Sequence, residues 1–218
     1  MHLLLIRHAE TGHNRDSRVQ GQADIPLSDL GMRQAAALGA YLQHESFTTI
    51  IASPLARALA TAQAVARYHD VPVSVEPDLM EMHVGDMEGL STVEMRDRFP
   101  EFLAEWVTER GPALEMPGGE SLIQVQQRVW AVVERLHQRD RDARVALISH
   151  NFVLSALLTR ALDMPLHEFR RFRLSVSGVS TLRLRPERTV LVRLNDTCHL
   201  RAAGLPSTDP WAARAPRT

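Results

Sequence analysis

The sequence predicts an α/β fold, a three-layer sandwich in which a mainly parallel central sheet carries helices on both faces. Short apolar runs alternate with helical patterns along most of the 218 residues, which is typical of βαβ units. Two of these runs, at 3–6 and 145–148, contain no polar residue, as expected for strands buried on both faces. We expect one domain over residues 1–206, with a small insertion at 79–119 over the carboxyl edge of the sheet and a flexible tail at 207–218.

The elements follow from local patterns. Strands are predicted at short segments that are apolar or alternating, namely 3–6, 47–52, 71–75, 145–148, 179–184 and 190–194. Helices are predicted where apolar residues recur every three or four positions, through 28–42, 53–65, 121–138 and 151–162. Ser28 fits the N-cap of the first helix, and Ser53 with Pro54 fits the N-cap and first position of the second. The polar segment 11–26 is predicted to be a loop, and 186–189 a turn between the last two strands.

Composition excludes several classes of protein. The chain has 25 Lys+Arg and 26 Asp+Glu, a net charge of -1, without the basic excess that nucleic acids or anionic membranes attract. No apolar run approaches the length of a membrane span, and no charged segment precedes the apolar start. The single cysteine, Cys198, excludes an intramolecular disulfide and a cysteine-based zinc site. We therefore expect a cytoplasmic protein with neither nucleic acid nor membrane as a partner.

Both uninterrupted strands end in a histidine. Arg7 and His8 follow the first strand, and His150 follows the second after Ser149. The carboxyl ends of parallel strands share the edge where open α/β proteins bind ligands, so the two imidazoles meet if the strands are neighbours. An arginine fork matches phosphate or carboxylate oxygens, and a neutral imidazole can attack phosphorus, accept a proton or bind a metal.

Arg57 is a further residue that favours an anion-binding site. Arg57 falls in the first turn of the helix predicted at 53–65, near backbone N–H groups and the positive end of the helix dipole. A metal site is the alternative for the histidines, but the chain has no His-Glu-x-x-His motif and no cysteine partner. Arg7 beside His8 would also repel a cation. We expect a small-anion site without metal.

The segments around these residues resemble those of the histidine phosphatase superfamily, which has the phosphoglycerate mutase-like fold. The matching motifs lie in the family's order at 5–14 (LIRHAETGHN), 20–28 (QGQADIPLS), 53–58 (SPLARA), 79–89 (LMEMHVGDMEG), 117–121 (PGGES) and 148–150 (ISH). Two positions depart from the family pattern, because Ala9 and Asn151 stand where glycine is common. Neither change removes a reacting group.

The resemblance implies a role for each matching residue. His8 would be the nucleophile that takes the phosphoryl group, and Glu81 would protonate the leaving oxygen and later assist water. Glu10, Asp86 and Glu88 are competing carboxylates. Besides His8 and Glu81, the resemblance implies catalytic roles for Arg7, Arg57 and His150. It implies substrate binding by Arg7, Asn14, Gln20, Gly21, Arg57 and His150.

The function implied is that of the phosphatase branch. The expected enzyme is a metal-independent phosphomonoester hydrolase that acts on a small phosphorylated metabolite through a phosphohistidine, with no cofactor. One alternative is a cofactor-dependent phosphoglycerate mutase, which needs a closed site and more positive charge; another is a non-catalytic module that binds a phosphorylated ligand. The insertion at 79–119 is shorter than in the mutases of the family, which favours hydrolysis, and the complete set of reacting residues argues against a binding module. A homodimer through an edge strand is an expectation from the family alone.

Overall fold

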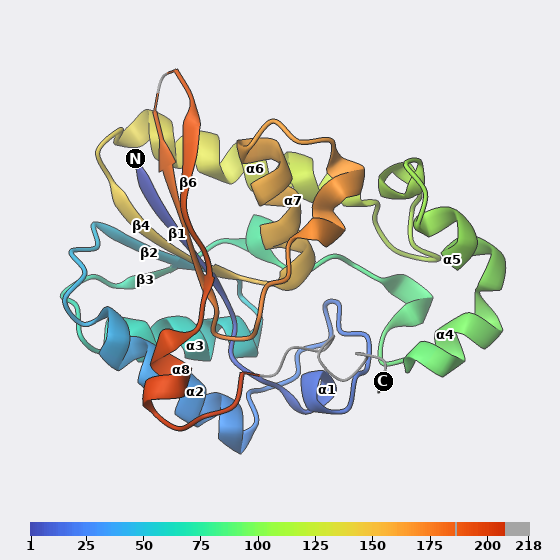
Figure 1. The fold of residues 1–218 in the computed structure, drawn as a ribbon, viewed down its shortest axis with the longest axis horizontal. Helices are drawn as coiled ribbons and strands as arrows, with labels where there is room; N and C mark the ends of the chain where they lie inside the picture. Colours follow the sequence, from blue (N-terminus) through green and yellow to red (C-terminus); the bar gives the residue numbers. More distant parts are fainter. Residues whose placement is uncertain (186, 208–218) are drawn as a thin grey trace, which may run out of the picture.

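A six-stranded sheet with strand order β3-β2-β4-β1-β5-β6 forms the centre of the computed structural model, which describes residues 1–185 and 187–207 (Figure 1). The strands are β1 (His2–Arg7), β2 (Thr49–Ala52), β3 (Val73–Val75), β4 (Arg144–Ser149), β5 (Val179–Leu184) and β6 (Thr189–Asp196). The first four pair in parallel, whereas β5 runs antiparallel to β1 and β6 antiparallel to β5. The predicted α/β fold is confirmed, with a mixed sheet whose parallel part includes both histidine-bearing strands.

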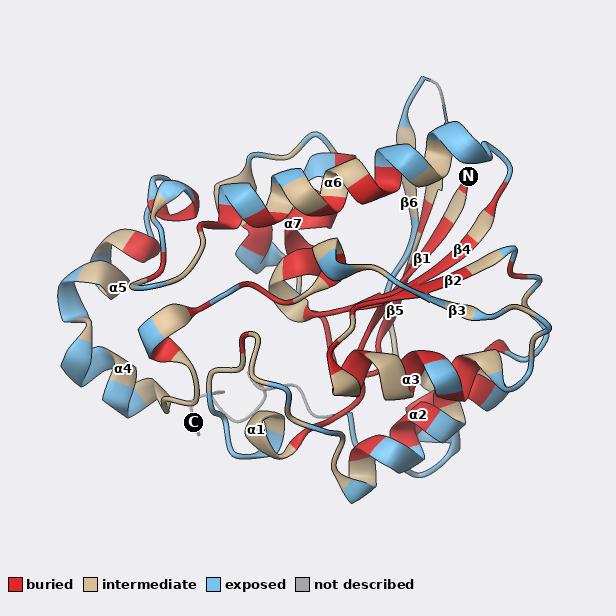
Figure 2. Ribbon diagram, turned by 180° about the vertical axis from the view of Figure 1, so that it is seen from behind, coloured by how far each residue is buried: buried red, intermediate tan, exposed pale blue. Residues whose placement is uncertain are grey.

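Helices cover both faces of this sheet. The α-helices are α1 (Gly12–Arg15), α2 (Asp29–Leu42), α3 (Ala56–Ala66), α4 (Thr92–Arg98), α5 (Pro100–Trp106), α6 (Leu122–Arg139), α7 (Asn151–Ala161) and α8 (Cys198–Ala202). Short 3-10 helices are η1 (Pro77–Leu79), η2 (Gly85–Met87), η3 (Gly111–Ala113) and η4 (Leu166–Arg171). Figures 1 and 2 show α6 and α7 on one face and α2 and α3 on the other, and Figure 1 shows α8 beside α2 and α3. In the described part of the chain, none of the helices combines the length and the apolar character needed to cross a bilayer.

The alternation of side chains along β1 explains the three layers. Leu3 and Leu5 belong to the core cluster that includes residues of α6 and α7, and Leu4 and Ile6 belong to the cluster that includes residues of α2 and α3. All four side chains are buried, and most of β1 has the colour of buried residues in Figure 2. A shift of one residue in the pairing of β1 would exchange its two faces, so the two cores fix the register of the strand that carries His8.

The predicted start of the second helix is wrong. α3 begins at Ala56, and its N-cap residue is Leu55, which makes no side-chain capping bond. The Ser53 hydroxyl instead accepts a hydrogen bond from the Leu55 N–H at 3.3 Å, closing a turn between β2 and α3. The Ala56 N–H donates to Oδ1 of Asp24 at 2.7 Å. A carboxylate from the 11–26 segment therefore occupies the helix start that the sequence left open to an anion.

The structure also contains short helices that the sequence did not predict. The predicted loop at 11–26 contains α1, which begins with a capping box between Thr11 and Asn14, and α8 follows β6 without having been predicted. One-turn helices leave almost no periodic signal. The insertion at 79–119 holds α4 and α5, which lie at one end of the molecule, outside the layers of the sandwich (Figure 1); its action as a lid stays a prediction. The tail predicted at 207–218 lies, after its first residue, outside the described residues, as does Pro186 of the predicted turn.

Gly31 lets the start of α2 pack directly on the segment that carries His8. A Cβ at this position would lie 2.0 Å from the Glu10 carbonyl oxygen, so the backbone would have to move. We expect Gly31→Ala to lower the free energy of unfolding by about 1–3 kcal/mol, although alanine is the better helix former. Urea denaturation measures this change. Gly12→Ala is the control, since the nearest atom to its Cβ would be 3.9 Å away, and equal destabilisation of the two variants would contradict the close approach.

Candidate active site

His8 and His150 lie beside each other at the carboxyl edge of the sheet. β1 and β4 pair in parallel with Arg7 opposite Ser149, so the residue that follows each strand leaves the sheet at the same level. The ring centroids of the two histidines are 5.1 Å apart, and both side chains are buried. The structure thus brings together the two imidazoles that the strand ends predicted.

The His8 ring is oriented by its neighbouring backbone. Nδ1 lies 2.7 Å from the Ala9 carbonyl oxygen, which can only accept, so Nδ1 carries the proton and Nε2 keeps its lone pair. Burial, and then the positive charges of Arg57 and Arg7, hold the pKa of His8 well below its ordinary value. The imidazole is therefore neutral and nucleophilic at Nε2.

His150 offers a different atom. Its Nε2 lies 2.8 Å from the Ser53 hydroxyl, and its Nδ1 is buried without a hydrogen-bond partner in the described part of the chain. The Ser53 hydroxyl can donate its proton to Nε2 while it accepts from Leu55, and in that arrangement the ring proton of His150 lies on Nδ1. Burial, followed by Arg57 and His8, keeps the pKa of His150 well below its ordinary value. A buried N–H of this kind is a donor suited to an anion.

Arg57 is fully buried and is held by one loop. Its Nη1 donates to the Ala23 carbonyl at 2.8 Å, and its Nη2 donates to the Gly21 carbonyl at 2.7 Å. The Gln20 amide satisfies its surroundings when its oxygen accepts from Arg57 Nη1 and Nε, at 3.0 and 3.3 Å, and its nitrogen donates to Thr11. The guanidinium is thus fixed by neutral acceptors, which leave its charge available.

Glu88 anchors the same loop from its other side. Its two carboxylate oxygens accept from the Gly21 N–H at 2.9 Å and the Ala23 N–H at 3.1 Å. The backbone units that hold Arg57 through their carbonyls are therefore held by Glu88 through their amides. This gives Glu88, one of the competing carboxylates, a structural task.

The remaining predicted residues lie as follows. Arg7 is buried, and its Nη1 donates to the Leu174 carbonyl at 2.5 Å. Asn14 belongs to the capping box of α1, where its Oδ1 accepts from the Thr11 N–H at 3.1 Å. Direct substrate binding by Asn14, Gln20 and Gly21 stays a prediction. The hydrogen bonds described for the Asn14 and Gln20 side chains and for the Gly21 backbone are with Thr11, Arg57 and Glu88.

Glu81 is the buried carboxyl of the insertion. Oε1 accepts from the Met82 N–H at 2.9 Å, and Oε2 accepts from the Phe152 N–H in the first turn of α7 at 3.3 Å. Burial raises the pKa of Glu81, against the opposing effects of these hydrogen bonds and of Arg57 and Arg7. The carboxyl therefore retains its proton to a higher pH than an exposed glutamate, which suits a proton donor.

Sequence reasoning missed the contact of Ser53 with His150. The signal was its position directly after β2, which neighbours β4 in the sheet, so that Ser53 and His150 reach the same edge. Within the described ranges, no group of three or more His, Cys, Asp or Glu side chains is arranged to hold a metal ion.

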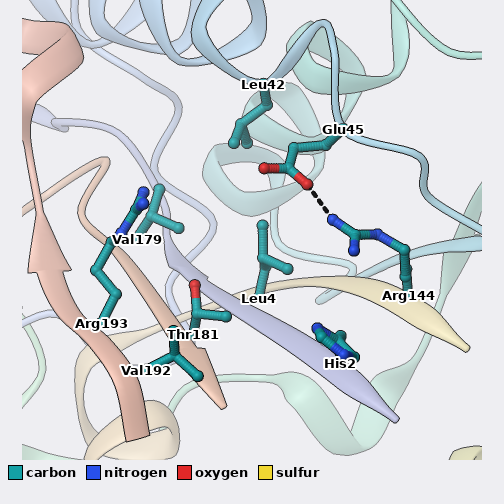
Figure 3. A pocket seen from close by; sticks show the side chains of 9 residues that line it. All are labelled: His2, Leu4, Leu42, Glu45, Arg144, Val179, Thr181, Val192 and Arg193. Carbon is teal, nitrogen blue, oxygen red and sulfur yellow. Dashed lines mark hydrogen bonds and ion pairs between the residues drawn. The ribbon is translucent and has the colours of Figure 1, made fainter. Parts of the chain in front are cut away.

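A surface hollow at the amino end of β1 lies apart from these residues (Figure 3). It is lined by His2, which begins the strand that His8 follows. Two arginines also line it, but Arg144 pairs with Glu45 (Figure 3) and Arg193 pairs with Asp196 at 2.9 Å. The hollow offers no convergence of reactive groups comparable to that around His8.

Comparison with known proteins shows which class this chain and its fold belong to. The sequence pattern of the histidine phosphatase superfamily (branch 1) matches residues 3–197, and the chain belongs to this superfamily. Phosphoserine phosphatase 1 of Hydrogenobacter thermophilus is 33% identical over 198 residues, which cover 91% of this chain and 93% of the relative. "Probable phosphoglycerate mutase GpmB" of Photorhabdus laumondii is 32% identical over 180 residues, or 83% of each chain. Among solved structures, alpha-ribazole phosphatase from Shigella flexneri matches with a TM-score of 0.80 and 32% identity, over 90% of this chain and 96% of that one.

These matches confirm the family resemblance, the phosphoglycerate mutase-like fold and the prediction that the protein is a phosphatase. The relatives named as phosphatases act on phosphoserine and on alpha-ribazole phosphate, which are small phosphorylated compounds.

Replacement of Glu88 tests the loop that holds Arg57. In Glu88→Gln the amide oxygen can accept from only one of the two N–H groups, and the negative charge is lost. We expect inorganic phosphate to bind about 10-fold more weakly, as for the loss of one charge-assisted hydrogen bond, measured by isothermal titration calorimetry. The control is Asp86→Asn, a neighbouring exposed carboxylate. Equal phosphate affinity of Glu88→Gln and the wild type would contradict this function of Glu88.

Proposed function

We propose that this protein is a metal-independent phosphomonoester hydrolase that transfers the phosphoryl group of a small metabolite to His8 and then to water. The observation that carries the proposal is the state of the His8 ring. Its Nδ1 is committed to the Ala9 carbonyl, its pKa is lowered by burial and by two arginines, and its free nitrogen is therefore a nucleophile beside positive charge.

In the first step Nε2 of His8 attacks phosphorus, and the bond from phosphorus to the leaving oxygen breaks. Glu81 gives its proton to that oxygen, so the product leaves as a neutral alcohol. Arg7, Arg57 and the Nδ1–H of His150 stabilise the charge on the other phosphoryl oxygens, because phosphoryl transfer depends mainly on positioning and electrostatics.

In the second step water attacks the phosphohistidine. Glu81, now a carboxylate, takes a proton from the water, and the bond from phosphorus to Nε2 breaks. Inorganic phosphate leaves, and both His8 and Glu81 return to their starting protonation states. The two arginines supply the positive charge that Mg²⁺ supplies in many phosphoryl-transfer enzymes, which supports a mechanism without metal.

The substrate class is a small phosphomonoester, as it is for the named phosphatase relatives. The mutase alternative is kept because one relative carries that name; the reacting groups of the first step would be the same, and only the acceptor of the phosphoryl group would differ. We also propose that the protein is cytoplasmic and forms a homodimer.

Covalent labelling tests the nucleophile. With phosphorus-labelled phenyl phosphate in the presence of EDTA, rapid quench of the wild type should trap an acid-labile phosphoenzyme. His8→Ala should form none and should lose nearly all turnover, because the attacking nitrogen is removed. His44→Ala, a change of an exposed histidine, is the control and should label normally. Loss of the label with EDTA would contradict metal independence, and rapid isomerisation of 3-phosphoglycerate without phosphate release would favour the mutase.

The protonation states predict a bell-shaped pH dependence of kcat/KM. His8 must be neutral, and since its pKa lies well below 6.5, activity falls only at pH values well below that. Glu81 must be protonated, and since its pKa lies above 4.5, activity falls on the alkaline side of that value. We expect a mildly acidic to neutral optimum with phenyl phosphate, and loss of the alkaline limb in Glu81→Gln. An unchanged alkaline limb in that variant would remove Glu81 as the acid.

A further inference from the structure

Glu81 lies on a segment without regular secondary structure. It falls between η1 and η2, where no strand or helix ladder fixes the backbone. By contrast, His8 and His150 directly follow strands, and Arg57 lies in α3. The Glu81 carboxylate accepts from the Phe152 N–H and the Glu81 carbonyl accepts from Gln22 Nε2 at 3.0 Å, and further contacts hold the backbone of the segment 78–83.

Arg128 of α6 makes several of these contacts. Its Nη1 donates to the Asp78 carbonyl at 2.5 Å, and its Nη2 donates to the carbonyl of Glu81 itself at 3.3 Å. Arg128 thus binds the backbone of the segment at two residues, one of which is the proposed acid. Its side chain is only 18% exposed, so these bonds are largely shielded from competing water.

Glu120 holds the arginine and the segment together. Its carboxylate accepts from Arg128 at two points, Oε2 from Nε at 3.1 Å and Oε1 from Nη2 at 2.7 Å. Oε1 also accepts from the His83 N–H at 2.8 Å, and the Glu120 N–H donates to the His83 carbonyl at 2.9 Å. The pair therefore fixes the backbone on both sides of Glu81.

We propose that Arg128 and Glu120 are positioning residues for the reaction, a two-sided clamp on segment 78–83 that sets where the Glu81 carboxyl meets the leaving oxygen. The proposal rests on the proposed function, in which Glu81 is the acid. It assigns to the pair an effect on proton delivery that is separate from the binding of phosphate.

This effect depends on the leaving group. Phenyl phosphate releases a basic phenolate that needs a proton, whereas p-nitrophenyl phosphate has nearly the same shape and releases an anion that departs without one. A misplaced acid therefore slows transfer from the first ester more than from the second. A general fault in folding or in phosphate binding slows both by the same factor.

The experiment measures the rate of phosphohistidine formation from each ester by quench-flow under single-turnover conditions. Arg128→Lys keeps the charge but cannot form the fork that reaches both carbonyls and the carboxylate. We expect its rate to fall about 10-fold more with phenyl phosphate than with p-nitrophenyl phosphate, a part of the 10²–10⁴-fold that a general acid contributes. Glu120→Gln, which retains an acceptor for His83, should shift the ratio in the same direction by a smaller factor.

Arg135→Lys is the matched control. Arg135 lies on the same helix and donates to the side chains of Glu76 at 2.8 Å and of Asp78 at 3.5 Å, rather than to the backbone carbonyls that Arg128 binds, and its own side chain is 54% exposed. It should leave the ratio of the two rates unchanged. In a Glu81→Gln background, Arg128→Lys should add no further change to the ratio, because the two substitutions remove the same proton transfer.

The outcomes separate this inference from the proposed function. If Glu81→Gln shifts the ratio and neither Arg128→Lys nor Glu120→Gln does, the clamp is overturned while the acid stands. If Glu81→Gln does not shift the ratio, the acid is misassigned and the clamp falls with it. A shift in all three variants, with Arg135→Lys unchanged, supports the clamp.

Discussion

The parallel pairing of β1 with β4 is the constraint on which the site depends. It sets Arg7 opposite Ser149, and so His8 and His150 leave the sheet side by side with their rings 5.1 Å apart. The pairing is fixed by two hydrophobic cores, because a slip of one residue would turn each strand's side chains toward the wrong helices. The geometry of the imidazole pair is therefore maintained by the same burial that stabilises the fold.

Burial shifts the pKa values of the site's titratable groups in opposite directions. It lowers the pKa of His8 and His150 and raises the pKa of Glu81, because the charged form of either group is poorly solvated there. All three groups are thus driven toward neutrality. Arg57 stays charged, and its hydrogen bonds go to two backbone carbonyls and the Gln20 amide. The site accordingly combines a positive charge with conditions that favour neutral imidazoles on His8 and His150 and a protonated carboxyl on Glu81.

The sequence was sufficient for the parts of the protein that regular elements position. Uninterrupted apolar runs predicted β1 and β4, and the residues that follow them had to share an edge once the strands were parallel neighbours. It was insufficient where contacts come from far along the chain. The capping preference of serine predicted that α3 starts at Ser53. In the structure Asp24 accepts from the Ala56 N–H at the start of α3, and the Ser53 hydroxyl contacts His150. The contact between Glu88 and the Gly21 amide likewise joins loops that no local pattern relates.

The residues of the site are therefore positioned in two ways, some by regular secondary structure and some by contacts with side chains far along the chain. His8 and His150 follow strand ends, and Arg57 lies at the start of α3, so the backbone positions of these three residues are set by regular elements of the fold. Glu81 is set by side chains that bind the backbone of an irregular segment, and it lies at the start of the insertion that holds α4 and α5. Loops can be altered with less cost to stability than strands of a buried sheet. Glu81 and the insertion can therefore change position while His8, the proposed nucleophile, stays in place. This is consistent with similarity of this chain both to relatives named as phosphatases and to one named as a mutase.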